Sequence, residues 1–186
     1  MSRSSEIMAE RRASNAKALA AFGIEGESIS VEVKTIAEGS GPSVFTIGYE
    51  RRDGEDLISK LIDNGVTVLV DVRQRAMSRK ADFRGKALAA RCEEAGIDYV
   101  PMPTLGSTDE LRDELRKSGD FQSFAKGFRA LTRRKAMKGP IEELAELAEE
   151  ATIAMICYER SHYECHRSVL AEVLHKKIDA TIIAIQ

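Results

Sequence analysis

The chain has 186 residues, of which 43% are hydrophobic and 31% are charged, and it carries a formal net charge of −2 with a pI near 6.0. This length and composition predict one globular domain and exclude the low hydrophobicity and high net charge of a disordered protein. The small net charge also excludes an overall positive field that would attract nucleic acid or anionic lipid, so any such binding has to be local.

The sequence lacks the segments that would direct it to a membrane. No apolar run approaches the roughly 20 residues that a membrane-spanning helix requires, and the first residues lack the apolar stretch of a secretion signal. Three cysteines at irregular spacing argue for reduced thiols and against a disulfide framework. We therefore expect a cytoplasmic protein with no membrane partner and no cofactor. The sequence does not define an oligomeric state.

Residues 1–42 predict an N-terminal helix and an extended arm. Residues 4–22 are rich in Ala, Glu, Arg and Lys and are followed by a glycine, as is typical of a helix. Residues 29–36 alternate between polar and apolar, which favours a half-buried strand or an extended arm. The turn-rich stretch 38–42 then marks the boundary to a single domain over residues 43–186.

From residue 43 onward, apolar segments alternate with amphipathic ones. The expected strands are residues 44–47, 66–72, 97–100, 152–156 and 181–185. The expected helices are residues 53–62, 86–95, 109–117, 121–134, 142–150, which follows Pro140, and 166–176. This alternation predicts a three-layer α/β fold, in which a mostly parallel sheet of about five strands has helices on both faces. Ligands of such sheets bind beyond the carboxyl ends of the strands, so we expect the site in the loops that follow them.

The loops after the first two expected strands contain candidates for substrate binding. An acid at a strand end can orient an arginine or a substrate hydroxyl, and guanidinium groups can bind a phosphate or a carboxylate. The candidates are Tyr49, Glu50, Asp71, Arg73, Ser78 and Arg79. The alternative is a solvated basic loop with a local ion pair, in which Tyr49 only packs and Glu50 lies on the surface.

The segment after the fourth expected strand contains the reactive groups. Cys157 ends that strand, and Cys165 and His166 begin the next helix, where free N–H groups and the helix dipole favour a thiolate. The catalytic candidates are Cys157, Glu159, Cys165 and His166, and the candidates for holding an anion are Arg167 and Ser168. The alternative is that the cysteines are small core residues and that the last two residues cap the helix.

A metal site is not expected from these residues. Zinc held by Cys157, Cys165 and His166 would lack a fourth ligand and the usual ligand spacing. Cys92 lies inside an expected helix, and we interpret it as structural.

Several of these segments together resemble the bacterial and archaeal domain of unknown function 488. In chain order they are residues 45–50, 69–73, 78–80, 86–88, 95–99, 105–106, 157–160, 165–168 and 171–172. The resemblance spans about residues 43–186 and implies a compact α/β domain with no settled activity. The sequence departs from the family pattern at Arg51, where glycine is usual, and at Ala76, where proline is usual.

Three hypotheses about function follow. The leading one is a cysteine-containing enzyme that acts on a phosphate-bearing or otherwise anionic small molecule or nucleotide, and it is similar in arrangement to rhodaneses and cysteine phosphatases. Cys165 or Cys157 would be the nucleophile, and Glu159 or His166 would move protons. The second is a non-catalytic module that binds nucleic acid or a nucleotide. The third is a DNA-repair-type alkyl acceptor, because the Cys-His-Arg tripeptide at 165–167 resembles the acceptor cysteine of DNA alkyltransferases.

Overall fold

The computed structural model describes residues 33–186, and the helix expected over residues 4–22 lies outside this range. One sheet has six strands: β1 (Val33–Ala37), β2 (Ser43–Gly48), β3 (Val68–Asp71), β4 (Asp98–Pro101), β5 (Ile153–Cys157) and β6 (Thr181–Ile185). The helices are α2 (Gly54–Asp63), α3 (Gly85–Glu94), α4 (Asp109–Ser118), α5 (Phe121–Thr132), α6 (Lys135–Glu150) and α7 (His166–Ile178). None of the helices in this part of the chain has the length and apolar character needed to span a bilayer.

The strand order is β1-β6-β2-β5-β3-β4, and only the pair of β1 with β6 is antiparallel. The predicted α/β class with a mostly parallel sheet is therefore confirmed. The sixth strand, β1, comes from the segment that was expected to be a half-buried strand or an arm. Ile36 and Ala37 pack against the core, so this segment joins the sheet as an edge strand.

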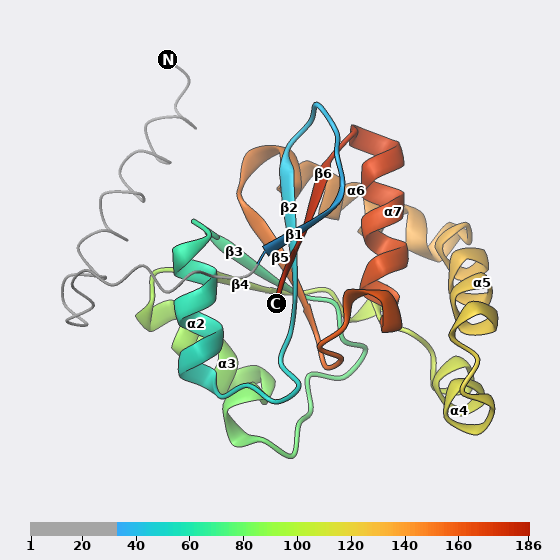
Figure 1. Ribbon diagram of the computed structural model, residues 1–186, viewed down its shortest axis with the longest axis horizontal. Helices are drawn as coiled ribbons and strands as arrows, with labels where there is room; N and C mark the ends of the chain where they lie inside the picture. The colour runs from blue at the N-terminus through green and yellow to red at the C-terminus, as the bar shows by residue number, and fades with distance from the viewer. Residues whose placement is uncertain (1–32) are drawn as a thin grey trace.

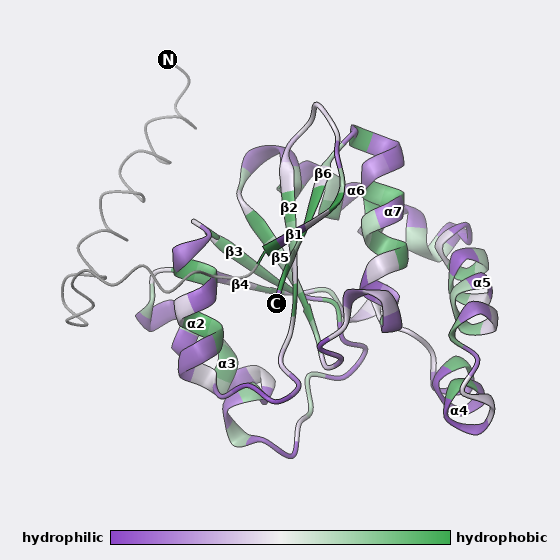
Figure 2. Ribbon diagram, viewed as in Figure 1, coloured by the Kyte–Doolittle hydropathy of each residue, from purple (hydrophilic) through white to green (hydrophobic). Residues whose placement is uncertain are grey.

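Helices cover both faces of the sheet, with α2 and α3 on one face and α5, α6 and α7 on the other (Figure 1). Side chains of a strand alternate between the faces, so Val70 packs in the layer of α5 to α7 while Leu69 packs in the layer of α2 and α3. Figure 2 shows the inner strands β2, β3, β5 and β6 as mainly hydrophobic and the helices with mixed surfaces, as expected for strands that are buried on both sides.

Helix α6 begins at Lys135, well before the predicted start at residue 142, and contains Pro140. A proline in a helix removes one backbone hydrogen bond and disfavours continuation. Met137 and Ile141 are both buried in the core on either side of this proline. Burial of these two side chains stabilises the turns of α6 that precede residue 142. The proline therefore does not mark the start of the helix.

Three adjacent strands end at the same edge of the sheet, where β5 lies between β2 and β3. Gly48 at the end of β2 pairs with Cys157, and Asp71 at the end of β3 pairs with Ile156. A Cβ atom on Gly48 would lie 1.9 Å from the carbonyl oxygen of Glu159. Glycine at this position therefore allows the loop after β5 to pass close to β2.

Candidate functional site

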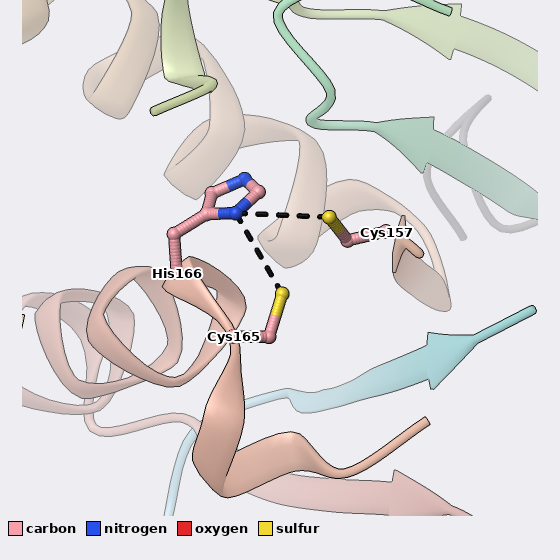
Figure 3. Close-up of side chains that lie close together, drawn as sticks. All are labelled: Cys157, Cys165 and His166. Atoms are coloured by element: carbon pink, nitrogen blue, oxygen red, sulfur yellow. Dashed lines mark hydrogen bonds between the residues drawn. The ribbon is translucent and has the colours of Figure 1, made fainter. Parts of the chain in front are cut away.

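Two thiols and an imidazole converge where β5 ends and α7 begins, and we call Cys157, Cys165 and His166 the thiol cluster (Figure 3). The Nδ1 atom of His166 lies 3.7 Å from Cys157 Sγ and 3.6 Å from Cys165 Sγ. The three residues are 6%, 2% and 5% exposed, respectively. The segment that follows β5 meets the end of β3, because His166 also contacts the backbone of Val72.

The contact with Val72 sets the tautomer of His166. Its Nε2 atom lies 2.9 Å from the Val72 carbonyl oxygen. A carbonyl oxygen can only accept a hydrogen bond, so Nε2 carries a proton. In the neutral ring Nδ1 is then unprotonated, and its lone pair faces both sulfur atoms. The ring of Phe128, with its centroid 5.3 Å from that of the imidazole, packs against it.

Arg167 and Glu159 bind to the thiol cluster from the loop side. Arg167 donates from Nε to Cys165 Sγ at 3.3 Å and from Nη2 to the Glu159 carbonyl oxygen. The Cys157 thiol donates to Glu159 Oε2 at 3.2 Å. These bonds hold the two sulfur atoms in place and provide positive charge beside Cys165.

The environment shifts the pKa values of the two cysteines in opposite directions. Burial alone would raise the pKa of Cys165, but the hydrogen bond from Cys157 and the charges of Arg167 and His166 hold it well below its usual value. The pKa of Cys157 is raised by the hydrogen bond with Cys165 and by burial. Burial would lower the pKa of His166, but the charge and hydrogen bond of Cys165, the bond to Val72 and the charge of Glu159 together raise it.

Burial, followed by the charge of Cys165, raises the pKa of Glu159 to about 7. The cluster therefore favours a thiolate at Cys165 and a protonated thiol at Cys157.

The thiol cluster lines a pocket of about 190 Å³, which we call the thiol pocket. Arg73, Arg75 and Arg112 also line this pocket. Arg75 and Arg112 both bind the carboxylate of Asp109 at the start of α4. Arg73 and Arg75 come from the loop after β3, and Arg112 comes from α4, so two separate segments bring cations to the pocket.

Asp71 and Arg73 form a second buried cluster with Tyr99, which we call the aspartate cluster. Arg73 binds Asp71 in a bidentate manner, with Nε–Oδ1 and Nη2–Oδ2 distances of 2.8 and 2.5 Å. Tyr99 donates to Asp71 Oδ2 at 2.5 Å, and Arg73 Nη1 donates to the carbonyl oxygen of Phe83 and to the hydroxyl of Tyr49. Burial would lower the pKa of Arg73, but the bonds and charge of Asp71 raise it.

The two clusters lie on opposite faces of the sheet. Asp71 is in register with Ile156, which packs against α2 and α3, so the side chain of Cys157 points to the other face. Asp71 is therefore not among the residues that line the thiol pocket, although Arg73 reaches it. The aspartate orients Arg73 from behind the pocket wall.

The remaining predicted residues are distributed around this edge. Tyr49 lines the thiol pocket, whereas Glu50 and Arg167 line a separate pocket of about 410 Å³. The hydroxyl of Ser168 donates to the Cys165 carbonyl oxygen within the first turn of α7. Ser78 accepts from the backbone of Lys80, and Arg79 is exposed; neither is among the residues that line the two pockets.

Sequence reasoning missed Tyr99, Arg112 and the backbone of Val72. Tyr99 lies near the end of a predicted strand, and the rule for strand ends could have found it. Arg112 gave no signal, because a charge on an amphipathic helix usually lies on a solvated face. The departure at Arg51 has a structural meaning, since its φ of 59° falls in the left-handed region that favours glycine.

Comparison with known proteins identifies a family. No curated protein and no solved structure matches the chain. A family model described as "Domain of unknown function DUF488" matches residues 53–174, which is more than half of the sequence and includes both clusters. The chain therefore belongs to the DUF488 family, as the resemblance of its segments predicted.

Proposed function

We propose that this protein is an enzyme that acts on a small anionic molecule, in particular a phosphate-bearing one, in the thiol pocket. The observation that carries the proposal is the position of the thiol cluster in a pocket that is also lined by three arginines. Reactive lone pairs and anion-binding groups then face the same volume. Neither feature alone would indicate a substrate.

Arg75 and Arg112 are the groups best suited to bind the anion. Their side chains are 63% and 35% exposed, and both bind Asp109, with which an incoming anion would compete. Guanidinium groups bind phosphate and carboxylate through paired N–H donors. Arg112 also donates to the carbonyl oxygen of Ser107 and to Gln74. Arg73 is less available than both, because its side chain is only 6% exposed and is paired with Asp71.

The size of the pocket favours a compact ligand. Its volume of about 190 Å³ is smaller than the roughly 300–1,000 Å³ of most small-molecule pockets. We therefore expect a phosphate ester, or the phosphate end of a nucleotide, to enter it. Within the pocket the thiol cluster supplies the reacting groups, and Glu159, next to Cys157 Sγ, is placed to move a proton.

The test compares two arginines on α4, of which one lines the thiol pocket and the other does not. Arg112 and Arg116 each bind an aspartate three residues earlier, but only Arg112 lines the thiol pocket. Turnover of p-nitrophenyl phosphate, bis(p-nitrophenyl) phosphate and uncharged p-nitrophenyl acetate is measured for the wild type, Arg112→Gln and Arg116→Gln. We expect turnover of the anionic esters only and a loss of kcat/KM of at least about tenfold in Arg112→Gln, as for a charge-assisted hydrogen bond. Arg116→Gln should match the wild type.

Two outcomes contradict the proposal. One is turnover of the anionic esters no faster than that of a Cys165→Ala variant, and the other is an equal effect of the two arginine variants. Binding of single-stranded DNA that weakens steeply with salt and survives Cys165→Ala would instead support a non-catalytic nucleic-acid module.

A further inference from the structure

We infer that the thiol cluster binds one divalent cation of the zinc class, with the sulfur atoms of Cys157 and Cys165 and the Nδ1 atom of His166 as ligands. Binding of the ion is independent of any substrate. Only the role of the ion as the reaction centre of the thiol pocket rests on the proposed function.

The two sulfur–nitrogen distances of the cluster fit a tetrahedral ion. Zinc bonds of about 2.3 Å to sulfur and about 2.0–2.1 Å to nitrogen, at tetrahedral angles, place a sulfur and a nitrogen ligand about 3.6 Å apart. In the structure the Nδ1 atom of His166 lies 3.7 Å from Cys157 Sγ and 3.6 Å from Cys165 Sγ. All three ligand atoms lie within 4.8 Å of one another. An ion can therefore bind without moving the imidazole away from either sulfur.

The surroundings of the cluster have the features that orient metal ligands. A ligating histidine usually donates its second ring N–H to a carbonyl or a carboxylate, which fixes the tautomer. His166 does so to the Val72 carbonyl oxygen, and in the neutral ring this bond leaves the Nδ1 lone pair facing the sulfurs. The hydrogen bond from Arg167 to Cys165 Sγ favours the thiolate, which is the form that binds a metal.

The donor atoms select the type of ion. Thiolate and imidazole ligands suit zinc and related transition-metal ions, whereas magnesium and calcium require oxygen ligands. Two thiolates also neutralise the charge of a divalent ion, which matters because Cys165 and His166 are almost fully buried. A buried site of this composition is consistent with a soft dication.

The missing fourth ligand, which argued against zinc in the sequence, is compatible with a catalytic site. Structural zinc sites have four protein ligands, but catalytic sites keep three and leave a position for water or substrate. The cluster borders the thiol pocket, so a fourth position would be accessible from it. There the ion would polarise an oxygen atom of the anion or activate a water molecule.

The test uses Co²⁺ as a spectroscopic substitute for zinc. The full-length protein is treated with a chelator and titrated with Co²⁺. We expect a thiolate-to-cobalt charge-transfer band and the intense visible bands of a four-coordinate ion, both saturating at one ion per chain. Zn²⁺ should abolish these bands and Mg²⁺ should not.

The third cysteine provides a matched control. Cys92 is also buried but lies in α3, outside the cluster. We expect Cys92→Ala to retain the cobalt spectrum, whereas Cys157→Ala and Cys165→Ala should weaken binding by more than about 100-fold, beyond the loss typical of outer-shell changes. Circular dichroism checks that each variant is folded. If a cysteine variant is not folded, the inference is judged instead from the cobalt spectrum of the wild type and its weakening in His166→Gln.

The inference is overturned if the wild type shows no charge-transfer band, or if the band survives in folded Cys165→Ala. Ester turnover that requires Cys165 in a protein that binds no cobalt would overturn the metal site and leave the proposed function standing. Cobalt binding without turnover of any ester would support the metal site and overturn the proposed function. Orthophosphate that alters the visible bands of the cobalt form would support an anion site next to the ion.

Discussion

The edge of the sheet where β3 and β5 end contains two polar clusters, which differ in how completely their polar groups bind one another. In the aspartate cluster both oxygens of Asp71 accept hydrogen bonds and each side-chain nitrogen of Arg73 donates one. In the thiol cluster the Nδ1 atom of His166 faces two sulfur atoms beside a pocket. A polar cluster whose groups satisfy one another holds the fold, whereas one whose lone pairs converge is available to a ligand.

The largest expected effect tests whether the aspartate cluster is structural. Arg73→Met leaves the buried Asp71 carboxylate without its cation, and we expect the free energy of unfolding to fall by about 3–5 kcal/mol. Urea denaturation measures the change. Arg91→Met, which breaks an ion pair with Asp82 on the surface, is the control and should cost about 0–1 kcal/mol. Equal losses in the two variants would refute the contrast.

The next effect tests whether the thiol cluster is open to a ligand. Free Zn²⁺ at about 100 times its Kd should raise the free energy of unfolding by about 2.7 kcal/mol, because it binds the folded state. Cys92→Ala should show the same increase and Cys165→Ala should show none. Thermal unfolding with and without Zn²⁺ makes the comparison. An increase of the same size in all three proteins would mean that the ion binds elsewhere.

A smaller effect probes the outer part of the aspartate cluster. Tyr99→Phe removes a hydrogen bond to Asp71 but leaves the bidentate pair with Arg73, so we expect a loss of about 1–2 kcal/mol. Tyr163→Phe, at an exposed tyrosine, should change stability by less than about 0.5 kcal/mol. If Tyr99→Phe had no larger effect than this control, the cluster would not be a cooperative unit.

The smallest effect concerns the backbone of the loop after β2, which borders both clusters. Arg51→Gly relieves a left-handed conformation, and we expect stability to increase by about 0.5–1 kcal/mol. Arg79→Gly, at an exposed residue without positive φ, should instead decrease stability slightly. A decrease in both variants would show that the Arg51 side chain outweighs its backbone strain.

The alternation of strands and helices could be predicted from the sequence, since hydrophobic periodicity is a local property. All five predicted strands are present, and the final one, Thr181–Ile185, has the predicted bounds. The start of α6 could not be predicted, because burial of Met137 and Ile141 offsets the proline only in the folded core. The family could also be inferred from short segments in the right order.

By itself, the sequence determined which reactive residues lie at the ends of strands and therefore at one edge of the sheet. Only the tertiary structure decided that Asp71 and Cys157 point to opposite faces, because that depends on the register between β3 and β5. It also decided the tautomer of His166, through a carbonyl 94 residues away in the chain. Contacts between distant segments set these features, and no local pattern in the sequence encodes them.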